Sequence, residues 1–308
     1  MSARVLRLLL WLYPPAWRAR YGEELDELVG SARAEQGTAR IALDLAVAAG
    51  RERLRSAGLI GDAITTADRE RGGVLLVLAA WSLFVLGGIG VEKASEQWQA
   101  AVTGAGRALP AHAFDLLVGA AVGGCLLTLA GITLALGSLR TFLRHGGWRR
   151  IRVPILRASA LTLATGVALI PLMLWAQRLN VAQRNGHDTT YAVAIALFAA
   201  LFALCLGAWT LAAVTTARQL DLTPQTLAAE KMLAAGVTAA MCVMTGATAV
   251  WWGALASRAP WFFTGTRPGS AGSVLPLNLV VPVVLMLLAT VLGALGTRRS
   301  FAARHAEV

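Results

Sequence analysis

From residue 73 onwards, the chain consists of long apolar runs separated by short polar segments. Six of these runs are long enough to cross a bilayer as α-helices, which takes about 20 residues. The pattern predicts an all-α, polytopic membrane protein with a transmembrane domain over 73–297 and a short cytoplasmic tail over 298–308. The six predicted transmembrane helices lie at 73–91, 113–136, 154–177, 191–217, 227–252 and 274–296.

Residues 1–72 carry a different pattern, in which apolar residues recur at the three- and four-residue spacing of amphipathic helices. Trp17, Tyr21 and Leu25 share one such face, which we expect to be mainly core. A second stripe contains Leu43, Val47, Gly50 and Leu54. We therefore predict a small three-helix module ahead of the membrane domain, with helices near 3–12, 16–34 and 38–57.

Most of the net positive charge of the chain lies in the predicted membrane part. The net charge is +11, and residues 73–308 contain 17 basic and only 7 acidic residues. Clustered arginine stays on the cytoplasmic side of a membrane, so both termini are expected in the cytoplasm and the protein in the cytoplasmic (inner) membrane. The basic surplus indicates contact with anionic lipids and no direct contact with nucleic acid. The predicted lipid contacts follow the second span and are Arg140, Arg144, Arg149, Arg150 and Arg152.

Catalytic and nucleotide-binding motifs are absent from the sequence. It contains no HExxH, GxSxG, GxxxxGK or GxGxxG. The four histidines are scattered, and no two cysteines have metal-ligand spacing. We therefore expect a non-enzymatic protein without a metal site or cofactor. Charged residues are nearly absent from the predicted spans, which weighs against an ion-coupled transporter.

Small residues in the predicted spans indicate close helix packing. Gly119 and Gly123 form a GxxxG motif, which serves either internal packing or the contact of a homodimer. The cysteines are expected to be buried between helices; they are Cys125, Cys205 and Cys242.

Two further segments carry local signals. Thr223 followed by Pro224 predicts the start of a helix. Trp261, Phe262 and Phe263 lie in a predicted outer loop and are expected in the lipid headgroup layer.

The segment LYPPAWRARYGEE resembles the N-terminal prefix of many bacterial membrane proteins, L-Y-P-x-x-W/F-R-x-R-Y/F-G-x-E. Such prefixes precede macrolide-exporter-type permeases. They also occur in small multi-pass proteins encoded beside sigma factors of the extracytoplasmic-function type. Those permeases carry a large extracytoplasmic domain, whereas the longest predicted outer loop here has only about 20 residues. The matching residues are Tyr13, Pro14, Trp17, Arg18, Arg20, Tyr21, Gly22 and Glu24.

The resemblance implies a non-enzymatic inner-membrane regulatory protein of the anti-sigma type. Its module would bind a cytoplasmic protein partner, with a sigma factor as the implied candidate, while membrane lipids surround the spans. The alternative is the membrane subunit of a small transporter or of an ABC-type exporter. The residues predicted to contact the partner are Trp17, Arg18, Arg20, Tyr21 and Glu24.

Overall fold

The computed structural model divides the chain into two compact units, Met1–Gly72 and Gly73–Val308, which we describe separately. The structure describes residues 13–14, 17–22, 24, 44–45, 47–52, 55, 66–95, 98–180, 183, 188–264 and 276–302.

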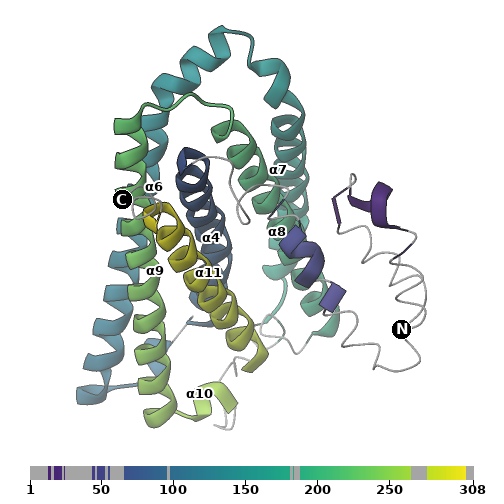
Figure 1. The fold of residues 1–308 in the computed structure, drawn as a ribbon. Coiled ribbons are helices and arrows are strands. Elements are labelled where there is room, and N and C mark those ends of the chain that lie inside the picture. Colours follow the sequence, from purple (N-terminus) through teal and green to yellow (C-terminus); the bar gives the residue numbers. More distant parts are fainter. Residues whose placement is uncertain are drawn as a thin grey trace. The chain divides into compact units, whose positions relative to one another are not determined.

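The described residues form helices and no strands, and six helices are long and apolar enough to cross a membrane. The prediction of an all-α protein with six such helices is confirmed. Each helix corresponds to one of the predicted runs, and most extend beyond it at one or both ends because polar residues continue the helix past the apolar part. The six are α4 (Thr66–Ala94), α6 (Ala108–Arg144), α7 (Trp148–Ala176), α8 (Thr189–Ala217), α9 (Pro224–Arg258) and α11 (Pro276–Ala302) (Figure 1).

Local sequence signals set several helix ends. The hydroxyl oxygen of Thr223 accepts a hydrogen bond from the Thr226 amide, with Pro224 at the first helical position, as predicted. Between α6 and α7, Gly146 has a φ of 80°, which favours glycine. The Gly147 and Gly146 amides donate to the carbonyls of Phe142 and Leu143, which is the Schellman pattern of a helix end.

Four helices, α4, α6, α9 and α11, form what we call the four-helix core. Glycines let the backbones approach closely. A Cβ atom on Gly73 would lie 2.6 Å from the carbonyl oxygen of Gly296, so α4 and α11 touch there. Likewise, Gly124 of α6 lies directly under the indole ring of Trp81 on α4. Small residues at such contacts are a common basis of helix association in lipid.

Threonine pairs join α9 to α11 within the same core. The hydroxyls of Thr238 and Thr297 lie 2.8 Å apart, and those of Thr245 and Thr290 lie 3.0 Å apart. Hydrogen bonds between helices stabilise membrane bundles modestly, by about 0.6 kcal/mol on average. These pairs fix the alignment of α9 against α11 along almost two turns of each helix.

Aromatic residues fill the end of the core where α4 and α9 finish. The ring of Trp251 contacts those of Trp98 and Phe114, with centroids 6.5 Å away in each case. Short helices lie at this end: α5 (Trp98–Ala101), the 3₁₀ helix η1 (Gly104–Arg107) and α10 (Trp261–Thr264).

The α10 aromatics, which are expected in the headgroup layer, also pack against the protein core. Phe262 is 4% exposed, and Trp261 and Phe263 are half-buried against the core. An apolar ring gains dispersion contacts by packing on neighbouring rings, and Phe263 contacts Trp252 with centroids 6.3 Å apart.

Helices α7 and α8 form the remaining pair, which we call the α7–α8 hairpin. The indole N–H of Trp209 donates to the Thr162 hydroxyl at 2.8 Å, and the rings of Trp175 and Tyr191 meet edge to face. In Figure 1, the hairpin and the α6–α9 pair lie on opposite sides of α4 and α11.

The described parts of the first unit include helical residues from the second and third predicted helices, at 17–22, 24, 44–45, 47–52 and 55. The predicted first helix lies outside the described residues. The predicted apolar stripe of the third helix is wrong at Val47, which is 63% exposed. Leu45 and Ala49, four residues apart on a different face, are buried instead.

Candidate functional site

The predicted partner-binding residues lie on one helical segment of the first unit. Trp17 stacks on Tyr13 with ring centroids 4.2 Å apart, and Tyr21 follows at 5.2 Å from Trp17. Tyr13 is buried, Trp17 is half-buried and Tyr21 is exposed. The three rings therefore form a row that runs from the interior of the unit to its surface.

Charged residues surround the exposed end of this row. The guanidinium carbon of Arg20 lies 5.3 Å from the ring centroid of Tyr21, a cation–π distance. Arg20 and Glu24 are exposed, whereas Arg18 is half-buried. The Arg18 amide donates to the carbonyl of Pro14 at 3.0 Å. This bond spans four residues, as in an α-helix, so Pro14 lies where the helical segment begins. Of the five predicted residues, Arg20, Tyr21 and Glu24 form the accessible surface.

Tyr13 connects this segment to the third predicted helix. Burial raises the pKa of the Tyr13 phenol, and the negative charge of Glu52 raises it further. Glu52 also pairs with Arg55 at 3.9 Å. Both effects on Tyr13 favour its neutral form, so the tyrosine of the LYP motif acts as a packing residue.

The five predicted lipid-contact arginines are all exposed. They lie around the turn between α6 and α7, which we call the arginine-rich end of the second unit. Among the described residues, no ion pair is recorded for them. The five residues are Arg140, Arg144, Arg149, Arg150 and Arg152.

The predicted small-residue contacts are partly corrected. An added Cβ on Gly119 or Gly123 would meet nothing within 4 Å, so the GxxxG motif makes no helix contact within the described chain. The adjacent Gly124 makes the contact, because it faces Trp81. Only Cys205 is buried as expected, since Cys125 and Cys242 face outwards. One position along a helix turns a side chain by about 100°, which separates Gly123 from Gly124.

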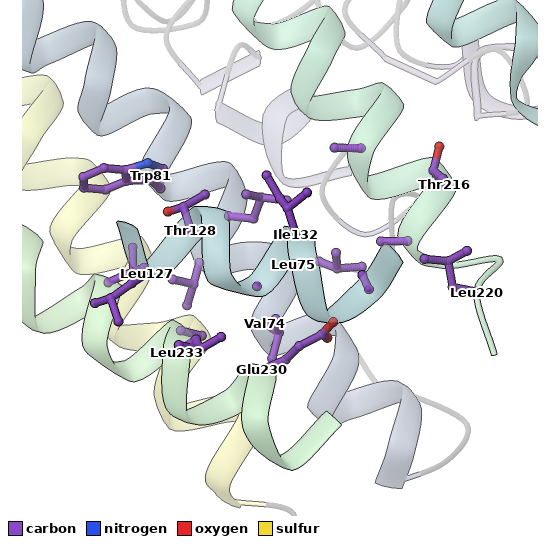
Figure 2. Close-up of a pocket in the computed structure, with 18 of the residues that line it drawn as sticks. Val74, Leu75, Trp81, Leu127, Thr128, Ile132, Thr216, Leu220, Glu230 and Leu233 are labelled. Atoms are coloured by element: carbon purple, nitrogen blue, oxygen red, sulfur yellow. The ribbon is translucent and has the colours of Figure 1, made fainter. Parts of the chain in front are cut away.

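A cleft of about 450 Å³ lies between the four-helix core and the α7–α8 hairpin. It occupies the half of the second unit nearer the arginine-rich end, because its α6 lining runs from Leu127 to Leu139 and its α8 lining begins at Trp209. Figure 2 shows lining side chains converging from several helices. The labelled lining residues are Val74, Leu75, Trp81, Leu127, Thr128, Ile132, Thr216, Leu220, Glu230 and Leu233.

The cleft wall is almost wholly apolar. Two of its hydroxyls are already used within their own helices, since Thr128 donates to the Gly124 carbonyl and Thr216 to the Ala212 carbonyl, each at 2.8 Å. The one ionisable side chain among the described lining residues is Glu230 of α9. Its neighbour Lys231 is 4% exposed and is not among the residues that line the cleft. The arrangement suits a hydrophobic ligand that carries at most one charged group.

The sequence did not reveal this cleft. Its walls come from five helices, from Val74 on α4 to Val237 on α9. Glu230 and Lys231 read as ordinary polar residues at the start of a helix. The signal that was present is a carboxylate within a largely apolar stretch, since charged residues within membrane spans are costly and therefore often functional.

Groups of three or more histidine, cysteine or acidic residues that could hold a metal do not occur in the part of the chain that the structure describes. Comparison with protein-family models, with curated proteins and with solved structures returned no match for this chain. Its function is therefore argued from its own residues.

Proposed function

We propose that the protein is a non-enzymatic regulatory protein of the cytoplasmic membrane, of the anti-sigma type, whose first unit binds a cytoplasmic protein partner. The observation that carries the proposal is the accessible surface formed by Arg20, Tyr21 and Glu24. Exposed aromatic and arginine residues are frequent energetic centres of protein interfaces. The resemblance of the surrounding segment to prefixes of regulator-associated membrane proteins makes a sigma factor the proposed partner.

Variants at exposed positions test this proposal. Trp17 is a poor target because it stacks on Tyr13, so its loss would disturb the unit itself. The informative variant combines R20E with Y21A. We expect it to lose the partner that the tagged wild-type protein captures from solubilised membranes.

R51E is the matched control, because Arg51 is an exposed arginine of the same unit on a different segment. It should retain the partner. Equal capture by the R20E–Y21A protein and the wild type, at equal protein levels, would refute the proposed surface.

The proposed orientation places both termini and the arginine-rich end in the cytoplasm. The test uses a protein in which Cys125, Cys205 and Cys242 are replaced by serine. H145C, at the arginine-rich end, should be protected from an impermeant thiol reagent in intact cells. T103C, near the aromatic end, should react. Reaction of H145C from outside would reverse the orientation.

A second candidate function is the membrane subunit of a small transporter or ABC-type exporter. The cleft favours it, because a cavity of about 450 Å³ is large enough for a small hydrophobic cargo. The cavity lies in the half of the second unit nearer the arginine-rich end. Identification of the captured partner separates the two candidates. A transcription factor supports the regulator, and an ATP-binding subunit supports the transporter.

A further inference from the structure

The charge distribution around the cleft is opposite to that of the protein as a whole. The chain has a net charge of +11, and the five exposed arginines around the α6–α7 turn lie at the same end of the second unit as the cleft. Yet no lysine, arginine or histidine is among the described residues that line the cleft, and Glu230 supplies its one formal charge. A ligand in the cleft therefore contacts one acidic side chain of the wall and no basic one.

The position of Glu230 makes this charge effective. The residue is half-buried, lies where α9 lines the cleft, and interacts with other groups of the protein. In apolar surroundings a carboxylate attracts a cation more strongly than it does in water, because the effective dielectric constant is lower. An anion would be disfavoured by the same effect.

Two indole rings lie in the wall of the cleft. Trp81 is 7% exposed and closes it against α6, while Trp209 belongs to the hairpin on the other side. The Trp209 N–H is already bonded to Thr162, which leaves the ring to contact a ligand. Indole is the best of the aromatic side chains for contact with a cation.

We propose that the cleft between the four-helix core and the α7–α8 hairpin binds a lipophilic organic cation, with Glu230 as its charge partner and Trp81 and Trp209 as its aromatic contacts. The volume of about 450 Å³ matches a drug-sized molecule. This inference goes beyond the proposed function. In a regulator the cation would be the signal, and in a transporter it would be the cargo.

Two probes of the same shape and opposite charge test whether the site prefers a cation to an anion. Tetraphenylphosphonium and tetraphenylborate are both hydrophobic, so detergent or lipid alone does not explain a preference for the cation in a protein with a net charge of +11. We expect the purified full-length protein in dodecyl maltoside to bind radiolabelled tetraphenylphosphonium saturably. Unlabelled phosphonium should displace it. Tetraphenylborate forms an insoluble salt with the phosphonium, so it is assayed in a separate sample, where it should show no saturable binding.

The variant E230Q keeps the size of the side chain and removes its charge. We expect it to weaken phosphonium binding on the order of tenfold, the factor that about 1.4 kcal/mol produces. D221N removes a negative charge from an exposed residue near the arginine-rich end. E92Q removes one near the C-terminal end of α4, away from the cleft. Both controls should bind as the wild type does.

A second variant blocks the cleft without touching its charge. An added Cβ on Gly131 would meet only a methyl group of Leu233 at 3.8 Å, so G131F can be accommodated with its ring in the cleft. We expect G131F to abolish binding while the protein elutes as a single species.

Four results would overturn the inference: no saturable phosphonium binding to the wild type, saturable binding of tetraphenylborate in its own sample, unchanged binding by E230Q, or unchanged binding by G131F. A loss in D221N equal to that in E230Q would also overturn it, because the effect would then come from the surface field of this end.

Discussion

Helices α4 and α8 are equally hydrophobic, but their surroundings in the second unit are opposite. The most apolar window of each has a mean hydropathy of 2.4, yet 44% of that window is buried in α4 and 6% in α8. Hydropathy thus indicates that a helix enters a bilayer, but it does not indicate what the helix packs against. In lipid there is no hydrophobic force that would bring two apolar helices together.

The difference between the two helices comes from small residues. Gly73, Gly87 and Gly90 of α4 all lie against α11, so the two backbones approach closely and gain dispersion contacts. Gly207 of α8 has nothing within 4 Å of where a Cβ would lie. The four-helix core is therefore held by close packing, and the hairpin meets it across a cleft.

The largest expected effect on stability distinguishes Gly73 of α4 from Gly207 of α8. In G73L the new side chain would collide with the backbone of Gly296 and Ser300, which no rotamer change relieves. We expect it to lower the free energy of unfolding by about 3 kcal/mol, at the upper end of typical overpacking. G207L places the same side chain in lipid and should change the value little. SDS titration of the solubilised proteins measures both.

Comparable losses in G73L and G207L would contradict the assignment of α4 to a tightly packed core. The proteins should be compared at the same detergent concentration and lipid content, since both alter the reference state.

A buried aromatic ring gives the next contrast. Phe84 of α4 is fully buried and stacks with Trp81 at a centroid distance of 5.9 Å. F84A should lower the free energy of unfolding by on the order of 2 kcal/mol, which is less than in a soluble protein. The cost of the cavity remains, but the cost of losing the transfer of the ring out of water is largely absent in lipid. The matched change L204A, at a 64% exposed position of α8, should cost much less. Similar costs would mean that α8 also packs closely against protein.

The sequence was a sufficient guide to the helices and an insufficient guide to their contacts. Apolar runs long enough to cross a bilayer predicted all six long helices, and Thr223 with Pro224 predicted where α9 begins. Contacts depend on the rotation of each helix about its axis. Gly123 and Gly124 are neighbours in sequence, but only Gly124 meets another helix. The cleft was not predicted either. Its walls are far apart along the chain, and which residues face it depends on the rotation of each helix.

Polar contacts between helices predict a smaller effect. In the double variant T238V–T297V, the hydroxyl pair that joins α9 to α11 is lost without leaving an unpaired group. We expect a loss of about 0.6 to 1 kcal/mol. T215V, on α8, removes a hydroxyl that donates only to the Leu211 carbonyl of its own helix, and it should be nearly neutral. An equal effect of the two would show that the α9–α11 pair contributes nothing beyond local hydrogen bonding.

Helix α6 combines both kinds of surroundings, and it yields the smallest expected effect. One face packs on α9 and holds Gly124 under Trp81, whereas Gly119 and Gly123 face outwards like Gly207 of α8. Because nothing lies near these two glycines, the double variant G119L–G123L should change the free energy of unfolding by less than about 0.5 kcal/mol. A loss as large as that of G73L would place this face inside the core.

The same double variant decides whether the motif serves a dimer. If two copies of the chain meet at Gly119 and Gly123, leucine at both positions separates them, because the close approach of two backbones needs residues without bulk. Size-exclusion chromatography with light scattering would then show a smaller particle for the variant than for the wild type. G246L is the control, since Gly246 on α9 is equally open but lies on another helix. Equal particle mass for all three proteins would assign the outward face of α6 to lipid, which is the surrounding that α8 already has over most of its length.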